Sequence, residues 1–282
     1  MLIRGALAVT AVTVCAMSCA AQDVWFLSPV SFRVDPGERL QVAVARERLE
    51  ERVEDAAAVP PDAAPFPTEL ADWVFVRGGG EQWNLHHPDP IEAASARIEL
   101  PMPTVGVAMI GMDCAPTVET VSPERLRAFI ADRAPGFAHL RIPEAAGGVR
   151  VRVNRSAKAL VRLTDGRTEG MASPVATSKA GQRSEIRLNV DPTVSAVGSE
   201  VPVRLYANWK SRTGVTFTAT HVRSGESRTI DVNEYGNGSV VLDGPGVWRL
   251  EFHYFEAAGD DEADFDLYSA TLTFKVAEEV ER

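Results

Sequence analysis

The stretches Val247–Phe255, with the sequence VWRLEFHYF, and Tyr268–Val276, with the sequence YSATLTFKV, decide the fold. Every second residue in each stretch is apolar or aromatic, and most of the residues between them are polar or charged. This period of two predicts strands with one buried side and one solvent-facing side. Two such strands need a second layer over their apolar side, so the pair predicts a β-sandwich.

The preceding residues extend this pattern over the last third of the chain. Val201–Tyr206 and Val215–Thr220 alternate in the same way, and Gly236–Gly238 has the composition of a hairpin turn. About seven short strands with turns at regular intervals are typical of an immunoglobulin-like sandwich. We therefore predict a C-terminal immunoglobulin-like domain over residues 192–282.

A second β-sandwich domain is predicted over residues 22–191. One short helix is expected within it at residues 122–133, because Ser122 can cap the helix and Pro123 suits its first turn. A charged insertion that ends in a proline-rich run interrupts the strands at residues 46–67. The predicted fold is therefore mainly β, with two sandwich domains and one short helix in the first.

The first 21 residues predict an export signal. Arg4 supplies a basic start, residues 6–16 are apolar, and small residues follow up to Ala21. The apolar run is too short to span a bilayer. A lipoprotein signal with lipidation at Cys19 is the alternative reading, and it is the one membrane attachment that the sequence suggests. Either route predicts an exported protein of the periplasm or cell envelope.

Charge, cysteine content and motifs narrow the classes of function. The 282 residues carry 29 Lys and Arg against 39 Asp and Glu, a formal net charge of -10. An acidic surface repels nucleic-acid phosphates, so no nucleic-acid partner is expected. Cys114 is the one cysteine beyond the predicted signal, so no internal disulfide is expected. The sequence has no Gly-x-Ser-x-Gly motif and no recognisable carboxylate pair, so we predict that the chain is not an enzyme.

Histidines are the candidate ligands for a metal ion. His253 lies on the predicted solvent side of its strand near the acidic loop 260–266, where an imidazole and a carboxylate suit a divalent ion. His86 and His87 fall in a polar loop, and His221 ends a predicted strand. Simpler roles compete with ligation, because no regular metal-ligand spacing occurs. In those roles His253 is an exposed strand residue and His221 a residue at the edge of the core.

Three stretches together resemble a known bacterial family. They are QDVWFLSPVSFRVDPGERLQV at residues 22–42, VRVNRSAKALVRL at residues 151–163, and the tail that begins GSEVPVRLYANWKSRTGVTFTATH at residues 198–221. In these stretches the chain is similar to the family called domain of unknown function 4198, which is often grouped with periplasmic components of cobalt or nickel uptake. The resemblance implies an exported, two-part β protein that handles a divalent transition metal.

The resemblance also implies particular residues. The positions where this chain has the residue type expected for the family are Trp25, Arg155, Lys158, Trp248 and His253. Family members commonly have a histidine where this chain has Gln22, and another where it has Arg46–Arg48. Both differences remove nitrogen ligands suited to nickel, cobalt or copper.

Two functions are therefore predicted. The first is an exported, non-enzymatic carrier of a divalent transition metal such as nickel or cobalt, with His253, His221, His86 and His87 as nitrogen donors. The alternative is a structural or protein-interaction module of the cell envelope, with a protein partner and no metal. Histidines that converge in space favour the carrier, whereas a contiguous exposed apolar patch favours the interaction module.

Overall fold

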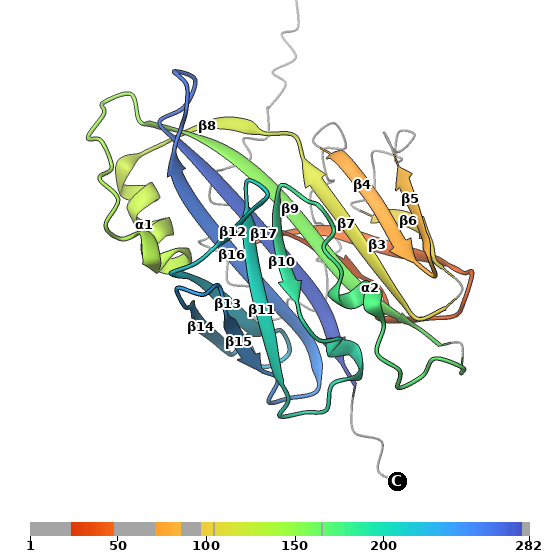
Figure 1. Ribbon diagram of the computed structural model, residues 1–282. Helices are drawn as coiled ribbons and strands as arrows, with labels where there is room; N and C mark the ends of the chain where they lie inside the picture. Colours follow the sequence, from red (N-terminus) through yellow and green to blue (C-terminus); the bar gives the residue numbers. More distant parts are fainter. Residues whose placement is uncertain (1–23, 48–70, 86–96, 104, 165, 278–282) are drawn as a thin grey trace, which may run out of the picture.

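The structure is a computed structural model that describes residues 24–47, 71–85, 97–103, 105–164 and 166–277 (Figure 1). The predicted signal with Cys19, most of the predicted insertion, and His86 and His87 lie outside the described residues. Within the described ranges, no helix is long and apolar enough to cross a membrane.

Strands make up most of the described chain. The strands are β1 (Val24–Pro29), β2 (Arg33–Val34), β3 (Arg39–Glu47), β4 (Ala71–Gly78), β5 (Glu81–Leu85), β6 (Arg97–Pro101), β7 (Val107–Cys114), β8 (Thr117–Val121), β9 (Val149–Leu163), β10 (Ser184–Leu188), β11 (Glu200–Ala207), β12 (Lys210–Arg212), β13 (Val215–His221), β14 (Ser227–Val232), β15 (Gly238–Val241), β16 (Gly246–Ala257) and β17 (Phe265–Val276). The helices are α1 (Pro123–Arg133) and α2 (Pro174–Thr177), with 3-10 turns η2 (Pro135–Phe137) and η3 (Pro192–Val194). The predicted mainly β fold is confirmed.

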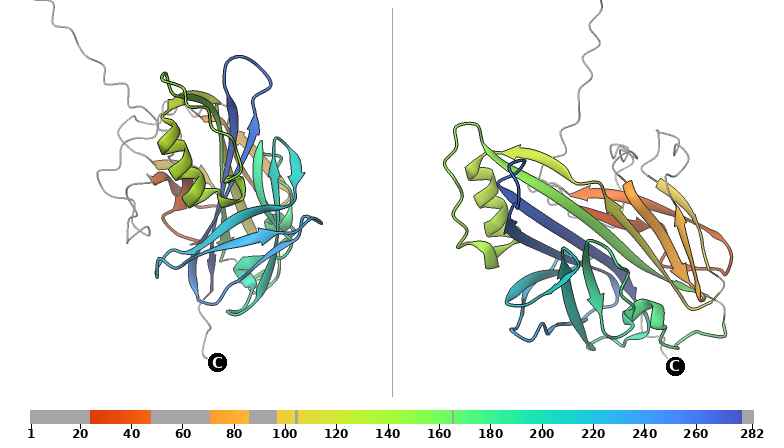
Figure 2. Two further views of the ribbon diagram at one scale, coloured as in Figure 1. Left: turned by 90° about the vertical axis from the view of Figure 1, so that its left-hand side faces the viewer. Right: turned by 45° about the horizontal axis from the view of Figure 1, so that its top comes forward.

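The strands form three sheets. The largest has ten strands in the order β14-β13-β16-β17-β9-β7-β4-β5, with β2 and β8 also paired to β9. A second sheet contains β1, β3 and β6, and a third contains β10, β11, β12 and β15. In the left-hand view of Figure 2, the blue strands β16 and β17 lie between the red strands of the second sheet and the cyan strands of the third.

The two smaller sheets cover opposite faces of the large sheet. On one face, Trp248 of β16 shares a hydrophobic core with Ile186 and Leu205 of the third sheet. On the other face, Val161 of β9 shares a second core with Val42 of β3. Each face of the large sheet thus buries its apolar side chains under a second layer, which is the sandwich arrangement that the alternating patterns predict.

The two halves of the chain meet inside the large sheet. β17 pairs in parallel with β9, from Phe265 opposite Val151 to Thr273 opposite Ala159. Strands from both predicted domains therefore belong to one sheet. The boundary predicted after Asp191 falls where the chain has left β10 and enters η3.

The expectation of a solvent-facing side on β16 and β17 is wrong. This side is buried together with its ionisable side chains, Arg249, Glu251 and His253. β1 covers part of it, since Thr271 Oγ1 donates a hydrogen bond to the carbonyl oxygen of Trp25 at 2.8 Å. α1 covers another part, where Phe129 meets the His253 ring edge-on with 5.0 Å between ring centroids. A two-residue period cannot show whether a polar side is later covered by another element.

The expected helix is α1. Ser122 caps it, because its side chain accepts a hydrogen bond from the backbone N of Arg125 at 3.3 Å. Leu126, Phe129 and Ile130 form its buried face, as their spacing predicts. α2, with four residues, is a second and shorter helix that the sequence did not suggest.

Gly111 of β7 lies where Phe75 of β4 crosses it. A Cβ atom at Gly111 would lie 2.2 Å from two carbons of the Phe75 ring. Phe75 is fully buried, so the ring has little room to move aside. The ring thus fills the space that a side chain at position 111 would need.

Replacing Gly111 with Ala should lower the free energy of unfolding by about 1 to 3 kcal/mol, because the Phe75 ring must shift within a packed core. Urea unfolding of the wild type and the variant measures this difference. Gly147→Ala is the matched control, since no atom lies within 4 Å of a Cβ built there. Equal stabilities of the two variants would contradict the packing described.

Candidate functional site

His253 lies in the interior beneath α1. Its Nε2 donates a hydrogen bond to Glu251 Oε1 at 2.7 Å, and Arg133 Nη1 lies 3.2 Å from both oxygens of the same carboxylate. Burial alone would raise the pKa of Glu251, but the hydrogen bond from His253 and the charges of Arg133 and Arg249 lower it to about 2. The carboxylate is therefore the centre of a buried charged cluster that ties the end of α1 to β16.

The acidic loop expected beside His253 is bound by arginines of β9. Arg152 Nη2 lies 2.5 Å from Asp260 Oδ1, and Arg150 Nη2 lies 3.3 Å from Asp264 Oδ1. These pairs neutralise much of the charge in the loop. The structure thus does not bring the imidazole of His253 and the loop carboxylates together as the sequence suggested.

His221 is held by two hydrogen bonds at the end of β13. Its Nδ1 lies 2.9 Å from Ser224 Oγ, and its Nε2 lies 2.9 Å from the carbonyl oxygen of Pro245. Its ring also packs against Trp248, with ring centroids 5.1 Å apart. Trp248 and His253 are an odd number of residues apart on β16, so they point to opposite faces of the sheet. His221 and His253 therefore do not converge.

The structure gives no set of ligands for the predicted metal. Among the described residues, no group of three or more His, Cys, Asp or Glu side chains could hold a metal ion. One ring nitrogen, His253 Nδ1, is buried with no hydrogen-bond partner in that part of the chain. A single donor does not make a site for nickel or cobalt, so the metal carrier stays a prediction.

The other residues implied by the family resemblance are parts of the interior. Trp25 and Trp248 are buried in the two cores. Arg155 pairs with Glu119 of β8 at 2.8 Å. Lys158 is different, because its partner belongs to the third sheet and the contact organises a surface.

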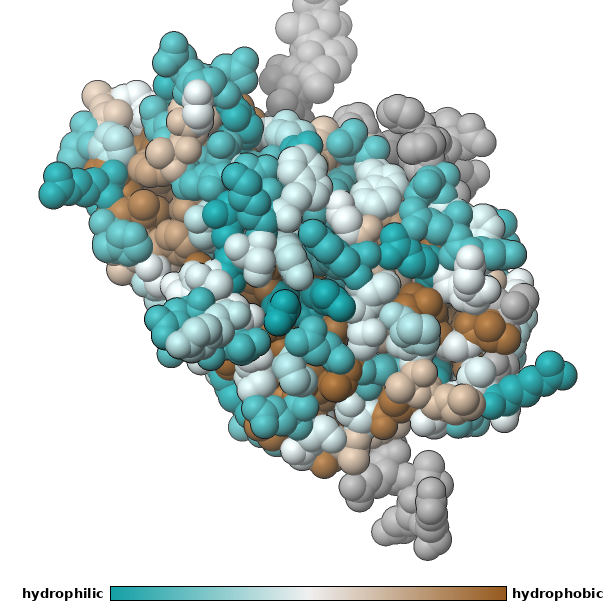
Figure 3. Space-filling view, in the orientation of Figure 1, coloured by the Kyte–Doolittle hydropathy of each residue, from teal (hydrophilic) through white to brown (hydrophobic). Residues whose placement is uncertain are grey.

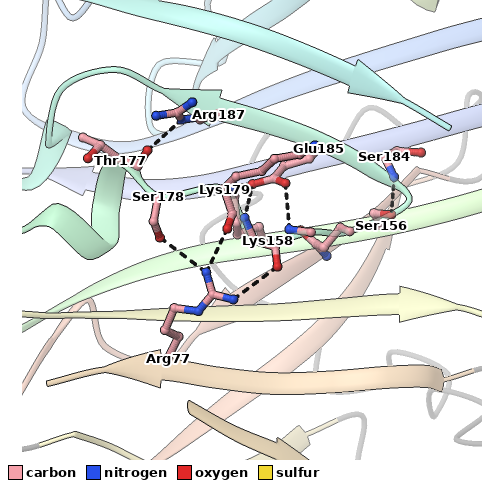
Figure 4. Close-up of polar contacts among 12 residues, drawn as sticks. Arg77, Ser156, Lys158, Thr177, Ser178, Lys179, Ser184, Glu185 and Arg187 are labelled. Atoms are coloured by element: carbon pink, nitrogen blue, oxygen red, sulfur yellow. Dashed lines mark hydrogen bonds and ion pairs between the residues drawn. The ribbon is translucent and has the colours of Figure 1, made fainter. Parts of the chain in front are cut away.

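Lys158 and Glu185 form an ion pair that is buried on both sides. Lys158 Nζ lies 2.9 Å from Glu185 Oε1, and the two side chains are 3% and 0% exposed (Figure 4). Burial lowers the pKa of Lys158, and the charge of Glu185 opposes this shift. The backbone N–H groups of Ala180 and Gly181 also donate to the carboxylate, at 2.6 and 3.1 Å. The carboxylate is thereby satisfied at both oxygens.

These contacts fix residues 178–185, which we call the support segment, onto the large sheet. Arg77 of β4 donates to the carbonyl oxygens of Lys179 and Ala180 at 2.8 and 3.2 Å (Figure 4). Gln182, which is buried, donates from Nε2 to the carbonyl oxygens of Met112 and Ala157 at 3.0 and 3.1 Å. The sheet thus holds an irregular segment in one position through side-chain hydrogen bonds.

Trp209 rests on the support segment at the turn between β11 and β12. Its indole Nε1 donates to the carbonyl oxygen of Gly181 at 3.3 Å, and its backbone N donates to that of Arg183 at 3.1 Å. Asn208 and Trp209 have φ values of 51° and 58°, as a two-residue hairpin turn requires. A bulky side chain in this left-handed region is unfavourable by about 1 to 2 kcal/mol, and glycine would avoid that cost. Trp209 nevertheless remains 53% exposed.

Cations surround Trp209 and its neighbour Tyr206. Arg183 Cζ lies 5.4 Å from the centroid of the Trp209 ring, and Lys179 Nζ lies 4.4 Å from that of Tyr206. We call this surface the Trp209 platform, and its residues are Lys179, Arg183, Arg187, Arg204, Tyr206 and Trp209. It belongs to the third sheet and the support segment, on the largely hydrophilic face seen in Figure 3. An exposed aromatic ring with adjacent cations can stack on a flat ligand and pair with its negative groups.

Sequence reasoning missed this platform. The strands on either side were recognised, but the residues between them, NWKSRTG at 208–214, received no role. The available signal was a tryptophan directly after Asn208 in a polar turn, where glycine is usual. Nothing in the sequence indicated that residues 178–185 would lie beneath that turn, because this contact depends on the buried ion pair.

Comparisons with known proteins add little. No protein-family model matches the chain, and no curated protein matches it. One solved structure that matches is described as "Structural insight into host cell surface retention of a 1.5-MDa bacterial ice-binding adhesin", with 9% sequence identity and a TM-score of 0.23. The match covers 90% of this chain, which spans 63% of the length of the other. Likeness at this TM-score carries no argument about function.

The Glu251 cluster should make stability depend on pH in the acid range. Because the folded-state pKa of Glu251 is about 2 and its ordinary value is 4.5, the ionised carboxylate stabilises the fold above about pH 4.5, and this stabilisation is lost as the pH falls toward 2. Glu251→Gln lacks this contribution. Urea unfolding at stepped pH should therefore show the gap in stability between wild type and variant shrinking across this window. A gap that stays constant would contradict the assignment.

The Lys158 and Glu185 pair should behave as one unit in a double-mutant cycle. Lys158→Met or Glu185→Gln alone should lower the free energy of unfolding by about 3 to 5 kcal/mol, since each leaves a buried group without its partner. The double variant should lose less than the sum of the two single losses. Urea unfolding of the four proteins measures the coupling, and additive losses would show that the two groups do not depend on each other.

Proposed function

We propose that the chain is an exported, non-enzymatic binding module of the cell envelope and that the Trp209 platform is its binding surface. The observation that carries this proposal is the exposed Trp209 at a backbone conformation that disfavours it. Residues kept at an unfavourable φ are concentrated at functional sites, where the surrounding structure holds them in place. Here the support segment holds Trp209, and the buried ion pair of Lys158 and Glu185 holds the support segment.

The alternative explanation of Trp209 as a packing residue accounts for less. A tryptophan that served only to fill space would be buried, whereas Trp209 is 53% exposed. Its indole N–H is bonded and one cation lies over its ring, yet about half of the residue stays open to solvent. Tryptophan and arginine are the side chains most enriched where binding energy is concentrated.

A binding role also fits the ionisable groups described above. The carboxylates of Glu251 and Glu185 are buried and bonded to cations and backbone N–H groups. Groups fixed in this way hold the fold together. The proposed activity therefore needs a surface and no reacting group.

The test compares the wild type with Trp209→Gly on a panel of immobilised probes, by biolayer interferometry. The panel contains dextran, methyl-esterified pectin, polygalacturonate, poly-L-glutamate and oligo(dT). At least one probe should bind, and Trp209→Gly should weaken that binding about 30-fold, as expected for a central tryptophan. Because glycine tolerates the φ of 58°, the stability of the variant should stay within about 1 kcal/mol of the wild type.

Met171→Ala is the matched control, because Met171 is 60% exposed and is not part of the platform. This variant should bind as the wild type does. If Trp209→Gly binds every probe as the wild type does, or if no probe binds the wild type, the proposed function is overturned.

A further inference from the structure

We propose that the ligand of the Trp209 platform is an anionic polysaccharide, whose sugar rings stack on Trp209 and whose acidic groups pair with the surrounding cations. This inference rests on the proposed function and names the class of its ligand. It is carried by three features of the platform: its charge, its strand pairing and its exposed ring.

The charge of the platform is opposite to that of the chain. The chain has a formal net charge of -10, yet the platform presents four cations, Lys179, Arg183, Arg187 and Arg204. In the part of the chain that the structure describes, none of the four forms an ion pair with a carboxylate, although other surface arginines such as Arg228 do. A local cluster of cations without counter-charges favours an anionic ligand.

Two of these cations face each other directly. Arg187 of β10 and Arg204 of β11 are register partners in an antiparallel pair. Like charges at such positions repel each other. Arg187 Nε donates to the carbonyl oxygen of Thr177 at 2.8 Å, while Arg204 is exposed. A negative group bound between the two guanidinium groups would remove the repulsion.

Two carboxyl groups, those of Asp113 and Asp266, interact electrostatically with Arg183 of the platform. Burial raises the pKa of Asp113 to about 6, against hydrogen bonds that lower it, including one from the backbone N of Arg183. Burial also raises the pKa of Asp266. The Arg183 side chain instead donates to the amide oxygen of Asn154 at 2.8 Å. Asp113 is still largely ionised at neutral pH and offsets part of the Arg183 charge, but in the described residues no ion pair joins the Arg183 guanidinium to a carboxylate, and the group lies beside the Trp209 ring.

The strand pairing argues against an extended acidic peptide. A peptide that adds to a sheet needs an open strand edge to supply backbone hydrogen bonds. β11 is paired on one side with β10 and on the other with β12 and β15. β10 is the edge strand of this sheet, and there the backbone N of Ser184 already donates to Ser156 Oγ at 3.2 Å. The platform therefore offers side chains to a ligand and little backbone.

The exposed ring argues for a sugar over a nucleic acid. Single-stranded nucleic acids bind by stacking successive bases on several aromatic rings. The platform exposes one such ring, Trp209, because Tyr206 is only 9% exposed and Lys179 lies over it. One ring flanked by several cations fits a polymer in which each sugar ring can stack through one face and carries its own acidic group.

The test uses two polymers that share a backbone, polygalacturonate and its methyl-esterified form, in which the negative charge is removed. The wild type should bind polygalacturonate at least 10-fold more tightly than the ester, and added salt should weaken the binding. Arg204→Gln should weaken it about 3-fold, as expected for one exposed charge pair. Arg223→Gln is the matched control, because Arg223 is an exposed cation outside the platform and should have no effect.

Three outcomes would overturn the inference: equal binding of both polymers, tighter binding of poly-L-glutamate or oligo(dT), and no effect of Arg204→Gln. The proposed function fails separately. Binding of dextran or the ester that is lost in Trp209→Gly would leave the binding module standing and reject only the anionic ligand. Binding that is unchanged in Trp209→Gly would reject both the binding module and the anionic ligand.

Discussion

The ion pair between Lys158 and Glu185 is the interaction on which the outer surface of the molecule depends. It joins β9 at the centre of the large sheet to β10 at the edge of the third sheet. Burying two charges is unfavourable unless the pair is close and its remaining hydrogen-bonding capacity is satisfied. Both conditions hold, since the Glu185 carboxylate also accepts from Ala180 N and Gly181 N. The pair thereby converts an irregular loop into a fixed support for Trp209.

Burial of both faces of the large sheet explains why its interior contains so many charges. A sheet covered on one side can leave polar side chains in water, whereas this sheet is covered by β1 and α1 on one side and by the third sheet on the other. Its ionisable residues must then find partners inside the protein. Beneath α1, the carboxylate of Glu251 bonds to Arg133 and His253. Beneath the support segment, Lys158 pairs with Glu185. Residues that looked like candidate ligands in the sequence therefore hold layers together.

How far the sequence predicts the structure depends on whether a feature is local. The strands β16 and β17 and the helix α1 follow from alternation, a capping serine and a first-turn proline, which act over a few residues. The burial of His253 does not follow, because it depends on α1 packing onto a strand more than a hundred residues away. The parallel pairing of β9 with β17 is also long-range, so no local pattern indicated that both halves share one sheet. The Trp209 platform combines a local feature with a long-range one. Trp209 is an unusual residue for its turn, which the sequence shows, but the support segment beneath it comes from a distant part of the fold.

The ionisable and aromatic residues fall into two groups. Those in the interior fix the sheets and α1, and those of the Trp209 platform form the binding surface that we propose. Mapping amide and indole NMR shifts of the protein during titration with oligogalacturonate tests this division most directly. We expect the shifts to change at the Trp209 indole and at the amides of residues 179–187 and 204–210, with those of 249–253 unchanged. Shifts concentrated at Glu251 and His253 would contradict it and would place the binding site beneath α1.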